Sequence, residues 1–335
     1  MDSFKALVVT EENGNTHVDI EELLPTQLHE GEVTIKVEYS SVNYKDGLAT
    51  LPNGGVARVH PLIPGVDLAG EVISSTSAEF SPGDKVIAHG YEIGVSHHGG
   101  FAEMARIPAN WVLPLPSTLS TREAMTFGTA GFTAAEAVIA LENHGIRPGT
   151  GPVLVSGATG GVGSHAVAML AKRGYEVVAS TGKLAEEGFL KRLGASSVID
   201  RQEVSKDSPK PLESARWAAA VDCVGSTTLS YILSTLRYGA AVAATGLVGG
   251  AAFTTTVMPF ILRGVSLLGI DSAHLDMRER REIWERLGSD LRPDSLEVLG
   301  EREVGLEELP SVLEEILKGK IKGRTLVRLT QSSAG

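Results

Sequence analysis

The middle of the chain alternates short apolar runs with longer stretches of helical periodicity. The apolar runs cover residues 153–156, 176–180, 196–199, 218–222, 240–244 and 265–269. Runs of this length, bounded by glycine and polar residues, are typical of strands buried on both faces. The helix-like stretches cover residues 162–173, 184–193 and 226–237. This alternation predicts a doubly wound parallel sheet with helices on both of its faces.

The chain before about residue 126 has a different rhythm. The stretch "EVTIKVEYS" alternates apolar and polar residues as a strand does, and "PLIPGVDLAGEVIS" and "SPGDKVIA" add apolar runs punctuated by proline and glycine. After residue 272 come two amphipathic helices, 276–290 and 306–319, and a final strand "RTLVRL". We therefore expect an α/β protein with a second, mainly β domain. The pattern alone leaves open whether the C-terminal elements join that domain.

Composition and charge restrict the function further. The 335 residues, 42% hydrophobic and 21% charged, suffice for two ordinary domains. Without a secretory signal or an apolar stretch of about 20 residues, the protein is expected to be cytoplasmic, with no membrane partner. The net charge of −11 disfavours nucleic acid as a partner. The only cysteine, Cys223, cannot form an internal disulfide, and we interpret it as a small buried hydrophobic residue.

The first strand of the predicted sheet leads into a glycine-rich loop. Residues 153–170 read "VLVSGATGGVGSHAVAML", and the following helix is expected to end at Gly174. A strand, a glycine turn and a helix in this order form a dinucleotide site, where backbone N–H groups and the helix N-terminus meet a pyrophosphate. A tight turn without a ligand is the alternative. The predicted contacts are Thr159, Gly160, Gly161, Val162 and Gly163.

The end of the second strand indicates which dinucleotide is bound. Enzymes that select NAD place an acidic residue there for the ribose 2′-hydroxyl. This chain instead has Ser180, Thr181, Gly182 and Lys183, with no acid before Glu186. Arg201, after the third strand, is a second candidate for a 2′-phosphate, and the cofactor is predicted to be NADPH. The alternative for Lys183 is an exposed solubilising charge.

Seven segments carry a resemblance to a known family. They are "SSVNYKDGLA" (40–49), "PLIPGVDLAGEV" (61–72), "YEIGVSHHGGFAE" (91–103), "GTAGFTAAEAV" (128–138), "SGATGGVGS" (156–164), "TTTVMPFILRGVSLLGIDS" (254–272) and "IKGRTLVRL" (321–329). Over essentially its full length the chain resembles the zinc-free branch of the medium-chain dehydrogenase/reductases, of the YhdH/YhfP type, described as quinone oxidoreductase or acrylyl-CoA reductase. The resemblance implies a GroES-like catalytic domain (1–130 and 273–335), a Rossmann domain (131–272), NADPH and a homodimer.

The same resemblance bears on metal binding. A catalytic zinc needs about three protein ligands. Zinc-dependent relatives have cysteine, histidine and cysteine where this chain has Asn43, Val66 and, nearby, Ala130, and the four-cysteine structural loop is missing. His97 and His98 stand together in a glycine-rich loop without further ligands and are interpreted as loop or cleft-wall residues. No metal is expected.

The resemblance also assigns roles to individual residues. Tyr44 would lie beside the nicotinamide and donate its phenol O–H, Asp46 would orient that network, and Asn43 would fix its geometry. For Asn43 and Asp46 the alternative is a turn before Gly47. Leu247, Ile261 and Ser272 would line the nicotinamide half, although Leu247 and Ile261 could be core residues. Arg324 would reach a cofactor phosphate.

Three functions remain compatible with the sequence. The first is NADPH-dependent reduction of an activated C=C bond, as in acrylyl-CoA or a similar short enoyl-CoA. The second is reduction of quinones, and the third is NADPH binding without catalysis. The intact "NYKD" at residues 43–46 argues against the third. Lys45 and Arg58 are basic residues available for a coenzyme A substrate.

Overall fold

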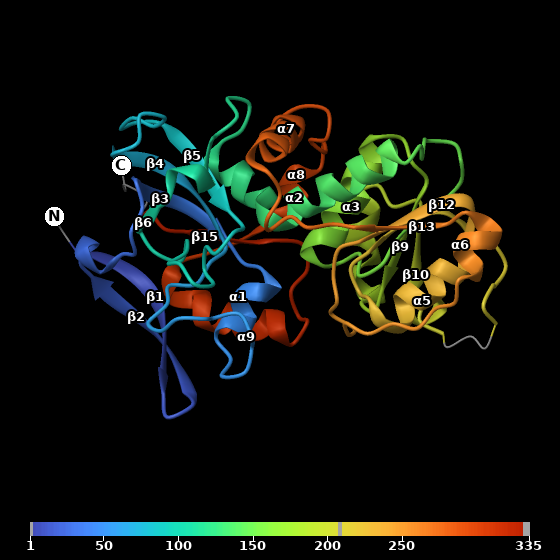
Figure 1. Cartoon of the computed structure of the whole chain (residues 1–335), viewed down its shortest axis with the longest axis horizontal. Coiled ribbons are helices and arrows are strands. Elements are labelled where there is room, and N and C mark those ends of the chain that lie inside the picture. Colours follow the sequence, from blue (N-terminus) through green and yellow to red (C-terminus); the bar gives the residue numbers. More distant parts are fainter. Residues whose placement is uncertain (1–2, 207–209, 331–335) are drawn as a thin grey trace. The chain divides into compact units, whose positions relative to one another are not determined.

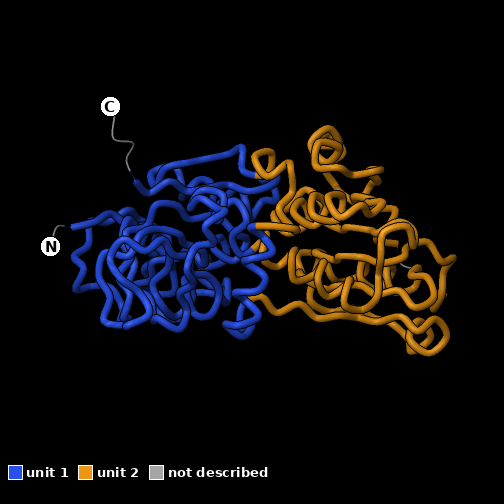
Figure 2. Tube along the Cα trace, turned by 90° about the horizontal axis from the view of Figure 1, so that it is seen from above, with its two compact units in different colours: residues 1–129, 273–288, 300–335 blue, residues 130–272, 289–299 orange. Residues whose placement is uncertain are grey.

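A computed structural model describes residues 3–206 and 210–330, which fall into two compact units (Figure 2). Unit 1 comprises residues 1–129, 273–288 and 300–335, and unit 2 comprises residues 130–272 and 289–299. Residues 289–299 thus group with unit 2, whereas the sequence-based division assigned them to the first domain. Helix α2 (Thr121–Asn143) contributes residues to both units.

Unit 1 is built mainly of β-strands. A hairpin joins β1 (Phe4–Glu12) to β2 (Asn15–Leu23). A seven-stranded sheet has the order β14-β15-β3-β4-β5-β7, with β6 also paired to β3. Its strands are β3 (Val33–Ser41), β4 (Asp67–Ser75), β5 (Lys85–His89), β6 (Met104–Ile107), β7 (Val112–Pro114), β14 (Arg302–Val304) and β15 (Thr325–Arg328). Because β15 pairs antiparallel with β3, the C-terminal segment returns to this domain.

Alternating side chains bury one face of β3. Val33, Ile35 and Val37 are fully buried, while Lys36 between them is exposed. Their core is closed by helix α9 (Leu309–Leu317), which contributes Leu309 to it. The other helices of unit 1 are α1 (Tyr44–Ala49) and α7 (Met277–Leu287).

Unit 2 contains the predicted parallel sheet. Its six strands are parallel and have the order β10-β9-β8-β11-β12-β13. They are β8 (Val153–Val155), β9 (Val177–Thr181), β10 (Ser197–Asp200), β11 (Trp217–Asp222), β12 (Leu236–Ala244) and β13 (Ser266–Gly269). The order reverses between β8 and β11, so right-handed crossovers place helices on both faces of the sheet (Figure 1). The predicted Rossmann fold is confirmed.

The helices of unit 2 depart from the pattern at their ends. They are α3 (Gly161–Lys172), α4 (Glu187–Arg192), α5 (Ser226–Thr235), α6 (Met258–Arg263) and α8 (Leu296–Leu299). A 3₁₀ turn, Leu184–Glu186, replaces the first turn of the predicted helix 184–193. Strand β12 starts directly after α5, earlier than residue 240, and α6 was not predicted.

Helix α2 is long and apolar enough, by length and composition, to cross a membrane. However, 78% of its apolar 18-residue window is buried inside the protein. Long buried helices of ordinary globular proteins have the same composition. Its burial therefore accounts for its apolar character.

His97 and His98 are packed inside unit 1. The ring of His98 stacks on His29 with centroids 3.7 Å apart, and His97 meets the same ring edge-on at 5.3 Å. The Nδ1 atom of His98 accepts the backbone N–H of Ile63 at 3.1 Å. Burial lowers the pKa of His98 to about 4, so its imidazole is neutral at pH 7. Both residues are buried packing residues of the loop.

Candidate functional site

A buried carboxylate, Asp67, organises the site region of unit 1. It is the first residue of β4 and is fully buried. Its Oδ2 accepts from Ser41 Oγ at 2.6 Å and from Asn43 Nδ2 at 2.7 Å. Its Oδ1 accepts from the backbone N–H of Thr129 at 2.9 Å and from the Thr129 hydroxyl. The carboxylate thus ties together the end of β3, the start of β4 and helix α2.

Arg324 neutralises this carboxylate from the C-terminal segment. The Nη2 atom lies 3.3 Å from Asp67 Oδ2, and the side chains are 2% and 0% exposed. Nη2 also donates to Ser41 Oγ, while Nη1 donates to Val42 O at 2.8 Å and to Asn43 Oδ1 at 3.1 Å. Both terminal nitrogens are therefore used within unit 1, and contact of Arg324 with a cofactor phosphate stays a prediction.

Tyr44 is the first residue of the short helix α1, for which Asn43 is the N-cap. Asp46, in the first turn, accepts the backbone N–H of Asn43 at 2.7 Å and that of Val66 at 2.9 Å. An acidic side chain that reaches back to the N-cap N–H holds the helix start in place. Tyr44 is 40% exposed, and its phenol makes no hydrogen bond within residues 3–206 and 210–330.

The charges in this cluster do not balance. Asp46 and Asp67 are both buried, and Arg324 is the cation paired with Asp67. Burial, and then repulsion from Asp67, raises the pKa of Asp46 from 3.8 to about 7. Near neutral pH Asp46 is therefore present in both the protonated and the ionised form. The two backbone N–H groups that it accepts favour the ionised form and limit the rise.

Gly128 lets α2 approach this cluster. Its backbone has φ 50° and ψ −158°, which is outside the helical range and kinks α2. A Cβ at this position would lie 2.4 Å from Asp67 Oδ2 and 2.5 Å from Ser41 Oγ. Only glycine allows both this φ and this approach.

In unit 2 the glycine loop has the shape expected of a dinucleotide site. Gly157 has φ 60°, and α3 begins at Gly161. A Cβ on Gly163 would lie 2.4 Å from the carbonyl oxygen of Gly157, so the helix packs directly against the turn after β8. The N-terminus of the 12-residue α3, with Thr159, Gly160 and Val162 around it, leaves N–H groups for an anion.

The turn after β9 fits a phosphate next to this loop. Thr181 Oγ1 lies 3.1 Å from Thr159 Oγ1 and accepts the N–H of Lys183 at 3.0 Å. The Arg201 side chain lies over Gly182, where a Cβ would be 2.8 to 3.0 Å from Cδ, Nε and Cζ. Ser180 Oγ is buried without a hydrogen-bond partner in the described part of the chain. These features fit the ribose and 2′-phosphate of NADPH.

The remaining predicted contacts of unit 2 lie near its surface or inside it. Leu247 is 63% exposed and Ile261 is 72% exposed, so neither is a core residue. Ser272 Oγ accepts from Thr133 Oγ1 at 2.7 Å. Cys223 is partly buried, and desolvation raises the pKa of its thiol to about 12, so it is an unreactive thiol.

Sequence reasoning missed Asp67 and Asp222. Asp222 ends β11, accepts the Ser156 hydroxyl, and accepts the N–H of Gly225 at 2.9 Å, so it links β11 to the end of β8. In both cases the available signal was a lone acidic residue at one terminus of an apolar strand: Asp67 starts β4 and Asp222 ends β11. Such a residue needs buried donors, but the sequence does not show where they come from.

The three positions that hold zinc ligands in zinc-dependent relatives carry no zinc-binding side chains here. Asn43 is bound to Asp67, Val66 is 3% exposed, and Ala130 is 4% exposed. Among the described residues, no group of three histidine, cysteine, aspartate or glutamate side chains is arranged to hold a metal ion. These donors do not fit a zinc site, and independence of the reaction from metal stays a prediction.

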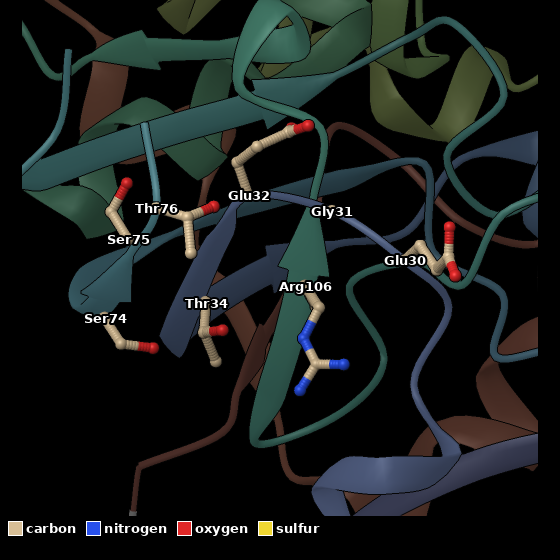
Figure 3. A pocket seen from close by; sticks show the side chains of 8 residues that line it. All are labelled: Glu30, Gly31, Glu32, Thr34, Ser74, Ser75, Thr76 and Arg106. Atoms are coloured by element: carbon tan, nitrogen blue, oxygen red, sulfur yellow. The ribbon is translucent and has the colours of Figure 1, made fainter. Parts of the chain in front are cut away.

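A surface pocket of about 370 Å³ lies elsewhere on unit 1. In Figure 3 the Arg106 side chain stands among small hydroxyl residues of neighbouring strands. The lining residues are Glu30, Gly31, Glu32, Thr34, Ser74, Ser75, Thr76 and Arg106. None of the predicted site residues belongs to it, so it is not the candidate site.

The protonation of Asp46 has a measurable effect on stability. A pKa raised to about 7 means that the folded state binds more protons than the unfolded state between about pH 4 and 7. The stability that Asp46 contributes is thus complete below pH 4 and is lost as the pH rises through 7. In Asp46→Asn this dependence disappears. We expect the advantage of the parent over the variant, measured by urea unfolding, to shrink between pH 4 and 7.

The exposed Asp19 provides a matched control for that measurement. Asp19→Asn removes an exposed carboxylate and keeps Asp46, so its unfolding free energy should still show the pH-dependent loss attributed to Asp46. A curve for Asp46→Asn that parallels the parent would mean that Asp46 is ionised throughout, and the proton assignment would be wrong.

Comparison with known proteins gives the same assignment along the whole chain. Residues 29–117 match the alcohol dehydrogenase GroES-like domain, and residues 161–288 match the zinc-binding dehydrogenase domain. The acrylyl-CoA reductase AcuI of Ruegeria pomeroyi is 50% identical over 97% of this chain and 98% of its own. YhfP of Bacillus subtilis, whose name assigns it to the quinone oxidoreductases, is 50% identical over 97% of this chain and 99% of its own.

Solved structures agree with these sequence matches. The structure of YhfP with NAD bound has a TM-score of 0.96 and covers 98% of this chain and 100% of its own. The YhdH oxidoreductase of Salmonella enterica in complex with NADP is 45% identical, with a TM-score of 0.94, and covers 97% of this chain and 100% of its own. The chain belongs to the medium-chain dehydrogenase/reductase family, in the YhdH/YhfP group of oxidoreductases.

Proposed function

We propose that the protein reduces the activated C=C bond of acrylyl-CoA or a similar short enoyl-CoA with NADPH, without zinc. The observation that carries the proposal is an exposed phenol, Tyr44, on a helix held by buried charges. The 50% identity to a protein named acrylyl-CoA reductase supports the substrate class. Unit 1 would be the catalytic domain and unit 2 the NADPH domain.

The proposed reaction requires a hydrogen-bond donor to the carbonyl oxygen of the thioester. When bound, NADPH supplies a hydride to the β-carbon of the alkene. The electron pair of the C=C bond then moves onto the thioester carbonyl, and the α-carbon takes a proton. Tyr44 is the candidate donor to that oxygen because its O–H has no protein partner among the described residues. Asp46 and Asn43 are positioning residues, since their bonds fix the start of α1.

A quinone is the second candidate substrate. A quinone accepts hydride and can take its proton from water, so it needs less from Tyr44. The 50% identity to YhfP supports this alternative. Steady-state kinetics of chelator-treated protein with NADPH and acrylyl-CoA, crotonyl-CoA or benzoquinone separate the two. We expect the highest kcat/KM with acrylyl-CoA and no loss after chelation.

A quinone preference in those assays would make the protein a quinone reductase. Activity that disappears with the chelator and returns with zinc would refute zinc independence. No turnover of any substrate, with NADPH still bound, would leave the protein as a non-catalytic NADPH-binding protein.

We also infer that the protein is a cytoplasmic homodimer. Among the described residues, β13 is an edge strand of the unit 2 sheet and forms a ladder with β12 alone. Leu267 on this strand is 37% exposed, and Leu262 in the neighbouring helix α6 is 57% exposed. Pairing of β13 with its copy would satisfy the edge and cover these residues. Light scattering of the purified protein measures the stoichiometry.

The cofactor preference follows from the turn after β9. Thr181, Lys183 and Arg201 offer donors and positive charge, and no acidic side chain stands at the end of that strand. Charge-assisted hydrogen bonds contribute roughly 1.5–3 kcal/mol each, so we expect NADPH to bind about a hundredfold more tightly than NADH. Fluorescence titration with both nicotinamides measures the ratio.

Two variants test which side chains cause the preference for NADPH over NADH. Arg201→Ala and Lys183→Ala should each reduce the ratio about tenfold by weakening NADPH alone, whereas Lys191→Ala on the exposed face of α4 should not change it. Equal affinities of the parent for NADPH and NADH would overturn the NADPH assignment. The structure of YhfP has NAD bound, so NADH is the relevant competitor.

Tyr44→Phe tests the proposed donor. The substitution keeps the ring and removes only the O–H, so NADPH affinity and Tm should stay at parental values. A positioned proton donor contributes roughly a hundredfold to ten-thousandfold in rate, and we expect kcat with the enoyl-CoA to fall by that order. The loss with benzoquinone should be much smaller.

Tyr238→Phe is the control, because Tyr238 is 84% exposed and lies in unit 2 on β12. Parental rates of Tyr44→Phe with both substrates would reduce Tyr44 to a packing residue. The donor would then be sought among ordered water, a backbone N–H and the substrate's other neighbours.

A further inference from the structure

A basic segment connects helix α9 to Arg324. Residues 318–324 read "KGKIKGR", with three lysines in five residues and no acidic residue. This local excess stands in a chain whose net charge is −11. A concentration of positive charge within an otherwise acidic protein indicates a place where an anion is received.

The backbone holds the lysines outward. Gly319, with φ 65°, ends α9, and its N–H bonds Ile316 O at 3.0 Å. The N–H of Lys320 bonds Glu315 O at 3.0 Å, which completes a Schellman-type helix end. Ile321 packs against the core of unit 1 and anchors the segment, whereas the three lysines are exposed.

Contacts at both ends place the segment beside α1. At its start, the side chain of Leu317 occupies the space next to Gly47, where a Cβ would lie 2.9 Å from Leu317 Cγ. At its end, Arg324 donates to Val42 O at 2.8 Å and to Asn43 Oδ1 at 3.1 Å. Both ends are therefore fixed to the helix that carries Tyr44.

The segment is longer than the gap it bridges. Asn43 and Gly47 are four residues apart, about 6 Å along a helix axis. The six residues between Leu317 and Arg324 could span roughly 20 Å if extended. The segment therefore need not run fully extended, and its three lysines are exposed. Lys45, exposed on α1 itself, adds a fourth positive charge.

Two neighbouring glutamates, Glu315 and Glu314, are already engaged in ion pairs. Glu315 is paired with Arg302 at 2.6 Å, and Glu314 is paired with Lys318 at 2.9 Å across one helical turn. Both members of the second pair are more than half exposed, so the pair is weak and Lys318 can turn to a stronger anion. Lys320 makes no ion pair within 4 Å among the described residues.

We propose that Lys318, Lys320 and Lys322 bind the phosphate groups of the coenzyme A half of the substrate. The inference rests on the proposed enoyl-CoA reductase function. Coenzyme A carries a 3′-phosphate and a pyrophosphate at the end of a flexible pantetheine arm, whose thioester end would lie near Tyr44. The phosphates of NADPH are the other anions in the reaction. Their candidate donors at the glycine loop and the Thr181 turn stand on unit 2, and Arg324, the candidate in unit 1, uses both terminal nitrogens for bonds inside the protein.

The experiment compares two thioesters in one triple variant. Acrylyl-CoA and acrylyl-pantetheine have the same reactive group, but only the first carries the adenosine phosphates. In Lys318→Gln/Lys320→Gln/Lys322→Gln, we expect the KM for acrylyl-CoA to rise roughly 5- to 30-fold, as three exposed charge contacts would give. The KM for acrylyl-pantetheine and the Kd for NADPH should change less than about twofold, and added salt should raise the parental KM for acrylyl-CoA.

The matched control removes the same charge elsewhere on unit 1, as Lys5→Gln/Lys36→Gln/Lys85→Gln, and should keep the parental KM values. An unchanged KM for acrylyl-CoA in the test variant would overturn the proposal. An equal rise in KM for both thioesters would also overturn it, because the segment would then have a structural role. Weaker binding of NADPH would overturn it too, because the lysines would then bind the cofactor.

Direct binding separates this proposal from the proposed function. Calorimetric titration of the NADP⁺-loaded protein with coenzyme A itself requires no turnover. If the parent reduces neither thioester but binds coenzyme A more tightly than the variant does, the reductase assignment fails and the phosphate site stands. If parent and variant bind coenzyme A equally, or not at all, the phosphate site is refuted.

Discussion

The buried ion pair between Asp67 and Arg324 is the contact on which the site region of unit 1 depends. Moving two charges out of water costs several kcal/mol each, and their attraction compensates only when the remaining lone pairs and N–H groups are satisfied. Here Ser41, Asn43 and Thr129 supply those bonds. These bonds join the segment from Ser41 to Asn43 and helix α2 to the start of β4, so the requirement to satisfy one carboxylate fixes the geometry of several elements together.

The need for glycine at position 128 follows from the same cluster. A side chain at position 128 would enter the space taken by Asp67 and Ser41. The chain resolves the conflict with a glycine at positive φ in the middle of a long helix. Removing either member of the ion pair would leave a buried charge, a change that typically costs about 3–5 kcal/mol.

Short-range patterns predicted the parts of the structure that depend on local sequence. The strands of unit 2 and the loop from Gly157 to Gly163 were predicted because burial on both faces and close helix packing leave a local signature. The paired ends of β3 and β15 were left open, and Asp67 was missed, because their partners come from residues far along the chain. The separation between Asp67 and Arg324 is 257 residues.

Individual side chains show the same limit of sequence reasoning. Leu247 and Ile261 are apolar, and apolarity alone allowed a core position, yet both are exposed. His97 and His98 were interpreted as loop or cleft-wall residues, but the ring that packs against them, His29, comes from another part of the chain. Helix α6 was missed because its six residues are too few for a periodic pattern.

The candidate anion-binding groups of the two units differ in kind. In unit 2 the candidate site consists of backbone N–H groups, a helix N-terminus and one guanidinium over Gly182, all set by local geometry. In unit 1 the guanidinium of Arg324 is buried and paired with Asp67. In the segment that Arg324 ends, the positive charge exposed to solvent therefore comes from the surface lysines. Because the net charge of −11 repels anions in general, affinity for a phosphorylated ligand has to arise at such local concentrations of donors. The buried bonds of Arg324 also fix one end of the segment 318–324. This segment carries Lys318, Lys320 and Lys322.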